Sequence, residues 1–184
     1  NFWKKNFSKL DIEEIVFNSE NIFKFKINDK LKLKNIDINS NIDIDFLKLK
    51  SSLKLKKFFP KIKEDLLFKN HQIKLNYKAD SLEITGSGIA FLQDEIDQIS
   101  YKIYKKKNEI RFKTRLDISK NPFKIDLLNF EKNKDTNLEL NFEGKSNLKN
   151  KLILSEVSLR EKDNTILLNK LIFFNNKIDS LSKI

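Results

Sequence analysis

Apolar and polar side chains alternate along most of this chain, and the alternation is clearest in the segment Glu109–Ile118. Every second residue from Ile110 onward is apolar or Thr there, and charged residues occupy all the positions between. Because successive side chains of a strand point to opposite faces, this period of two predicts a strand with one apolar and one charged face. The same alternation predicts three strands before it: Gln72–Lys78, Leu82–Leu92 and Asp97–Tyr104. The short polar connections favour antiparallel hairpins, since parallel crossovers need a dozen or more residues.

Amphipathic strands also precede this meander. Ile22–Ile27 and Leu31–Ile38 alternate on either side of a polar turn at 28–30. The apolar parity shifts between Leu33 and Ile36, and one extra residue there predicts a β-bulge.

A polar triplet at 39–41 predicts another turn, followed by a strand through Ile42, Ile44 and Phe46 and a second parity shift. Pro60 has no amide donor and ends the ladder, so 61–69 is expected to be a connection or a short helical turn. Residues 1–18 fit either a short helix or a strand.

After Ile118 the pattern predicts a short helix over Asn121–Phe130. Asn is a good N-cap, Pro is favoured at the first helical position, and Phe123, Leu127 and Phe130 have the spacing of one helix face. An edge strand through the same segment is the alternative. Strands are then expected around 138–143, 152–159 and 165–172, with the last two forming a hairpin, and a further strand near the C-terminus.

These elements predict a mainly β fold: a long, curved antiparallel meander sheet, a β-groove or half-pipe, with one short helix near residues 121–130. About eleven or twelve strands at about 4.8 Å each give a sheet on the order of 50 Å wide. The helix is too small to cover an apolar face of that size. The chain begins at Asn1 and has no Met, so we interpret residues 1–184 as a single β-groove segment of a longer protein. The sequence contains no run of about 18 apolar residues, so we predict no membrane-spanning helix within it.

Composition changes this picture little. The net charge is +11 and the pI about 9.6, but all except three of the 37 basic residues are Lys. The chain is also rich in Asn, Ile and Phe, whose codons, like those of Lys, are AT-rich, and the Lys residues are spread over the polar sides of the strands. We therefore expect no nucleic-acid partner, because phosphate binding requires a concentrated basic patch. The absence of Cys excludes disulfides and thiolate metal sites.

No catalytic constellation is evident. His71 is the only His, and without Cys or a convincing Ser or Asp partner it is expected to be a solvated or capping residue. Gly86-Ser87-Gly88 resembles a phosphate loop only superficially, since it lacks a third Gly and continues as a strand; it predicts a bulge or a close backbone approach. We predict a non-enzymatic protein with no cofactor and no metal site.

Four short patterns between about residues 70 and 145 resemble a repeating unit of the AsmA-like envelope proteins, most closely the YhdP and TamB type. They are a Gly-x-Gly strand at 84–91 (ITGSGIAF), two alternating strands at 99–103 (ISYKI) and 112–117 (FKTRLD), and the segment NPF at 121–123 followed by LLNF at 127–130. The earlier residues fit only as general amphipathic strands.

The resemblance implies a bacterial, periplasmic β-groove, anchored in the inner membrane by a segment outside this sequence. Its apolar interior would shield phospholipid acyl chains during transport between inner and outer membranes and so maintain the envelope barrier. The predicted lipid-binding lining is the apolar row of four strands: Ile73, Leu75, Tyr77, Ile99, Tyr101, Ile103, Ile110, Phe112, Leu116, Leu138, Leu140 and Phe142.

Two other interpretations of the same residues stay open at this stage. The apolar row could pack against itself as the closed core of a structural β-sandwich. Alternating strands of about ten residues are also typical of outer-membrane β-barrels, although a helix interrupts the meander and aromatic girdles are missing.

Overall fold

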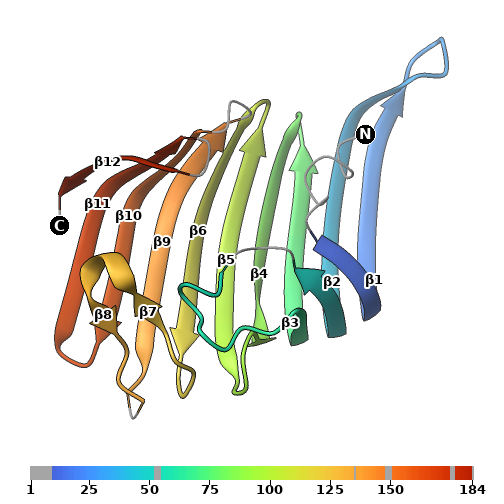
Figure 1. Ribbon diagram of the computed structural model, residues 1–184. Coiled ribbons are helices and arrows are strands. Elements are labelled where there is room, and N and C mark those ends of the chain that lie inside the picture. Colours follow the sequence, from blue (N-terminus) through green and yellow to red (C-terminus); the bar gives the residue numbers. More distant parts are fainter. Residues whose placement is uncertain (1–9, 52–54, 135, 148–150, 175–176, 184) are drawn as a thin grey trace.

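The computed structural model describes residues 10–51, 55–134, 136–147, 151–174 and 177–183. Within them, ten strands form one antiparallel sheet in the order β1-β2-β3-β4-β5-β6-β9-β10-β11-β12, so each strand pairs with its neighbours along the chain (Figure 1). The strands are β1 Leu10–Ile27, β2 Leu33–Ser51, β3 Asp65–Lys78, β4 Ser81–Phe91, β5 Asp97–Lys106, β6 Glu109–Ile118, β9 Leu138–Asn147, β10 Lys151–Glu161, β11 Asn164–Phe174 and β12 Lys177–Lys183. The sheet is long, curved and open, which confirms the predicted fold class.

For residues 10–18 the structure decides between the two alternatives: from Leu10 onward the chain is a strand and not a helix, while residues 1–9 of that prediction lie outside the described residues. The parity shift after Leu33 is a β-bulge, as predicted. Two residues of β2, one of them Asn35 with φ of 50°, lie opposite the single residue between Lys24 and Lys26 of β1. Asn tolerates this left-handed conformation better than most residues, which makes it suited to the extra position.

The predicted turn at 39–41 is wrong. Strand β2 continues through these residues, with Asn39 opposite Asn76 and Asn41 opposite Lys74 on the polar face. Ser40 lies on the apolar face, opposite Leu75, and is buried. The period of two therefore persists across the triplet, and the turn-favouring composition does not override it.

Only one three-residue helical turn is present where a helix was predicted. The segment forms a small hairpin of β7 (Lys124–Ile125), the 3-10 turn η1 (Asp126–Leu128) and β8 (Phe130–Glu131). Asn129 ends the turn in a left-handed conformation and donates its amide to the carbonyl of Asp126. The turn lies within 121–130, but the helix does not extend over that whole range, and Asn121 caps no helix.

A cap, made of residues 55–64 and 121–134, covers one end of one sheet face. The loop crosses in front of β4–β6, and the hairpin lies in front of β9–β11 (Figure 1). Phe59 of the loop and Phe123 of the hairpin are buried and pack edge to face, 5.3 Å between ring centroids. The amide of Lys124 donates to the carbonyl of Phe58, so the two parts of the cap are also joined through their backbones.

Beneath the cap lies the main hydrophobic core. The buried strand side chains of this core are Leu49, Leu66, Ala90, Leu116, Ile118, Leu138, Leu140, Val157, Leu159 and Leu168. Two buried amides hold the cap to the sheet. Gln93 accepts from the amide of Lys61 and donates to the carbonyl of Pro122, and Asn121 donates to Oδ2 of Asp97 at 2.8 Å. A buried side-chain amide is stabilising only when its donor and acceptor are satisfied, as they are here.

Candidate functional site

All twelve predicted lining residues lie on the same face of the sheet. Residues directly opposite each other in an antiparallel pair share a face, and one such row runs from Leu75 through Ile84 and Ile103 to Phe112. A second row joins Ile99, Leu116 and Leu140. The remaining members occupy the rows in between and on either side: Ile73, Tyr77, Tyr101, Ile110, Leu138 and Phe142.

The structure divides the twelve predicted lining residues into a buried and a partly exposed group. Leu116, Leu138 and Leu140 are buried, with Leu138 fully so, because the cap lies over them. They belong to the core, and the prediction that they line an accessible surface is wrong for these three. Sequence alternation identifies the face to which a side chain points, but it does not show what covers that face.

The other nine predicted residues are partly exposed, and neighbouring strands extend their surface. We call the part beyond the cap the open apolar face; by register it consists of Ile38, Ile73, Leu75, Tyr77, Leu82, Ile84, Ile103, Ile110 and Phe112. Leu82 and Ile84 lie in a predicted strand and Ile38 ends another. These three residues were not in the predicted lining, although the alternation of apolar and polar residues in their strands already indicated that they belong to it.

A hollow of about 550 Å³ lies at the end of this face opposite the cap. Its apolar lining comes from β1 to β4, and its charged lining consists of two lysines and one carboxylate, Lys105, Lys107 and Asp80, which we call its margin. The hollow is lined by Phe23, Ile38, Ser40, Leu75, Tyr77, Asp80, Leu82, Lys105 and Lys107. Ligand-binding pockets typically enclose about 300–1,000 Å³, with mostly apolar walls and a few polar groups. The hollow has a volume and a mostly apolar lining in these ranges, and it is half open to solvent.

The sheet exposes further apolar side chains at β1. Ile12 is 58% and Phe23 is 62% exposed, and Phe17, Phe25 and Ile27 are similar. Within the described residues, β1 is also an edge strand, which pairs with β2 alone. Contiguous exposed apolar surface of this kind is unusual on a soluble protein and marks an interaction surface.

The two glycines of Gly86-Ser87-Gly88 make room for rings that lie across the sheet. A Cβ on Gly86 would be 2.5 Å from Cζ of Tyr101, and one on Gly88 would be 2.6 Å from Cα of His71. The predicted close backbone approach is thus confirmed, and the motif lies within β4 and not in a loop.

Replacing Gly88 with alanine is expected to destabilise the protein by about 1–3 kcal/mol, since the new methyl group meets the backbone of His71 as well as its ring. Urea unfolding measures the change. Ser87→Ala, at the exposed position between the glycines, serves as the control and is expected to stay within about 0.5 kcal/mol of the parent. Equal effects of the two substitutions would contradict the close approach.

His71 is buried, so the prediction of a solvated or capping residue is wrong. Its ring stacks on Tyr101 at 5.6 Å, and its Nε2 lies 3.2 Å from the Tyr101 hydroxyl. Burial lowers the pKa of His71, which keeps the imidazole neutral at physiological pH. Within the described residues, the rings of Phe68 and Tyr101 pack against it.

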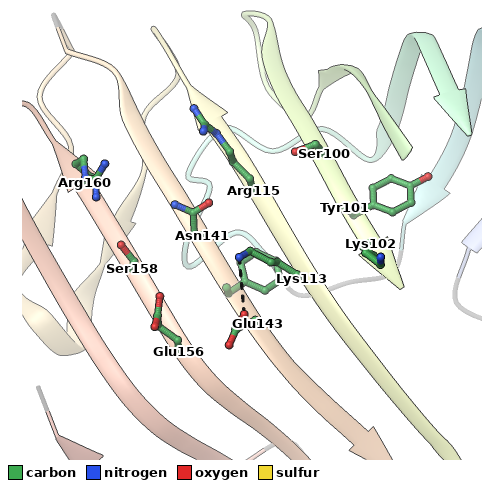
Figure 2. A pocket seen from close by; sticks show the side chains of 11 residues that line it. Ser100, Tyr101, Lys102, Lys113, Arg115, Asn141, Glu143, Glu156, Ser158 and Arg160 are labelled. Atoms are coloured by element: carbon green, nitrogen blue, oxygen red, sulfur yellow. Dashed lines mark ion pairs between the residues drawn. The ribbon is translucent and has the colours of Figure 1, made fainter. Parts of the chain in front are cut away.

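The opposite face of the sheet is polar. It carries a hollow of about 540 Å³, shown in Figure 2, to which β5, β6, β9 and β10 contribute residues such as Ser100, Arg115, Glu143 and Ser158. Its charges are largely neutralised within the face. Arg115 contacts Glu139 at 2.8 Å and also Asp117, and Lys113 lies 3.9 Å from Glu143. Exposed pairs of this kind stabilise a protein weakly, and we interpret this face as the solvated side of the sheet.

Among the residues that the structure describes, none of the groups of His, Asp and Glu has the arrangement of a metal site. In the same ranges, no helix is long and apolar enough to span a bilayer. No protein-family model, curated protein or solved structure matches the chain.

Proposed function

We propose that this chain is a segment of an AsmA-like envelope protein, and that its open apolar face shields the acyl chains of phospholipids moving between the inner and outer membranes of a bacterium. It acts without catalysis. The observation that carries the proposal is the partial exposure of a continuous apolar face beyond the cap. The resemblance of the patterns between residues 84 and 130 supplies the family, the periplasmic location and the inner-membrane anchor elsewhere in a longer protein.

The energetics favour an apolar ligand on this face. Removing apolar surface from water stabilises by about 25 cal/mol per Å², so an acyl chain lying along several rows of side chains gains substantially from the contact. The gain is available because the cap covers only one end. A closed sandwich would need a second sheet of matching size, and in the ranges that the structure describes the second sheet consists of β7 and β8 alone.

Substituting one side chain of the open face tests the proposal. Leu75→Asp places a carboxylate between Ile84 and Ser40 on the apolar face, and burying a charge there against an acyl chain is strongly unfavourable. We expect the parent protein, after incubation with phospholipid vesicles and gel filtration, to carry lipid that native mass spectrometry detects, and Leu75→Asp to carry at least tenfold less.

Asn76→Asp is the matched control. It introduces the same charge one residue further along β3, on the polar face, and is expected to leave lipid binding unchanged. Circular dichroism shows whether both variants keep the sheet. A parent protein that carries no lipid under these conditions would refute the proposal and leave a structural role for the sheet.

A further inference from the structure

One lysine breaks the division between the two faces. Lys105 pairs directly with Leu82 on one side and with Ile110 on the other, so it lies on the apolar face. At the register positions of this face in β3–β6, the other charged residue is Asp97, which lies beneath the cap. Lys105 is therefore the charged residue that these four strands contribute to the open part of the face.

AT-rich codons account for a general excess of lysine, but they do not account for a lysine on the apolar face. Lys102 and Lys106 on the same strand point to the polar face, as the alternation requires. Burial lowers the pKa of Lys105, so its ammonium group is partly withdrawn from water.

Lys105 stands at the margin of the hollow at the end of the open apolar face. Lys107, in the turn between β5 and β6, also lines the hollow, and Leu75 and Leu82 belong to its apolar lining, which we call the floor. The one carboxylate at the margin belongs to Asp80, which accepts a hydrogen bond from the Tyr77 hydroxyl at 3.2 Å. Two cations against one carboxylate leave the margin with a net positive charge.

We propose that this hollow holds one anionic phospholipid, with an acyl chain on the apolar floor and the headgroup phosphate at Lys105 and Lys107. The inference rests on the proposed function and adds a headgroup preference to it. Charge complementarity selects the lipid: a phosphate accepts charge-assisted hydrogen bonds from two ammonium groups, whereas a headgroup without net charge gains less from a margin with one excess positive charge. The floor excludes free inorganic phosphate as the preferred ligand, because phosphate makes no use of apolar walls.

Binding to vesicles of two compositions tests this site. The probes are dioleoylphosphatidylglycerol, which is anionic, and dioleoylphosphatidylcholine, which is zwitterionic and has the same chains. We expect the parent protein to take up more of the anionic lipid. The double substitution Lys105→Gln with Lys107→Gln is expected to weaken binding of phosphatidylglycerol about tenfold, as lost hydrogen bonds to charged groups do, and to weaken phosphatidylcholine binding less, because the choline cation offsets the charge of its phosphate.

A second double variant controls for net charge. Lys74→Gln with Lys106→Gln removes the same charge from exposed positions on the polar face of the neighbouring strands, and is expected to leave both affinities unchanged. An equal loss in the two double variants would overturn the site, because it would reduce the preference to general electrostatic attraction.

The other outcomes separate this site from the proposed function. Equal binding of both lipids by the parent protein overturns the headgroup site and leaves acyl-chain shielding intact. Binding of neither lipid overturns both. Asp80→Asn is expected to strengthen phosphatidylglycerol binding, since it removes the carboxylate from the margin; a loss of binding, together with a preference for phosphatidylethanolamine, would overturn the anionic assignment in favour of a zwitterionic headgroup.

Discussion

Replacing Leu138 with alanine is expected to destabilise the protein by about 2–5 kcal/mol. Leu138 is fully buried beneath the cap, opposite Ile118, which is also fully buried. Truncating it removes the transfer free energy of the lost methyl and methylene groups and leaves a cavity that the rigid strands on either side cannot close. Urea unfolding, followed by circular dichroism, measures the loss.

The same truncation on the open apolar face gives the contrast. Leu75 is partly exposed, so Leu75→Ala removes contacts on one side only and is expected to cost roughly 1 kcal/mol or less. An equally large loss at both positions would show that the open face is packed against a further layer, which would contradict its role as a lipid surface. The pair of variants therefore tests the division of the face into a capped and an open part.

Raising the pH from about 4 to about 7 is expected to destabilise the capped end of the sheet by up to about 3 kcal/mol through Asp97 alone. The carboxyl group is buried, and desolvation raises its pKa from 3.8 to about 6. A hydrogen bond from Asn121, one from the backbone of Ser119 and the charge of Lys132 oppose the rise without cancelling it. Oδ1 of Asp97 has no hydrogen-bond partner within the described part of the chain, which is consistent with the incomplete compensation.

The direction follows from proton binding. Between pH 4 and 6 the native state holds the Asp97 proton more tightly than the unfolded chain does, so the contribution is present at low pH and is lost as the pH rises through 6. Urea unfolding at a series of pH values measures it. Asp97→Asn cannot titrate and supplies the reference: the difference in stability between parent and variant is expected to change across this interval. A difference that stays constant from pH 4 to 7 would contradict the raised pKa.

The sheet was largely predictable because its signal is local. In a strand that is apolar on one side, five or six residues are enough to show which positions face the apolar side, as in Glu109–Ile118. A bulge then shows as a one-residue shift in the alternation, as it does after Leu33. Gly86 and Gly88 also indicated a structural feature correctly. A glycine within a strand commonly marks a place where another group approaches the backbone closely, and Tyr101 and His71 do so here.

The cap was not predictable in the same way. It depends on contacts between Phe59 and Phe123, more than sixty residues apart, and neither local pattern specifies the other. The spacing of Phe123 and Phe130 fits a helix face as well as a hairpin, and the tertiary contact with the loop decides in favour of the hairpin. For the same reason the sequence placed Leu138 in the binding surface: alternation identifies the side of the sheet and is silent on what lies over it.

The serial order of the strands has a consequence for cooperativity. Every extensive contact between strands of the large sheet joins strands that follow each other along the chain. Each inner strand is therefore held in place by the two strands beside it. Within the described residues, the terminal strands β1 and β12 have one neighbour each, whereas strands from β2 to β11 contribute side chains to the core beneath the cap. Such a sheet is expected to unfold from its outer strands inward. The outer strands are also the ones to which a further strand can pair.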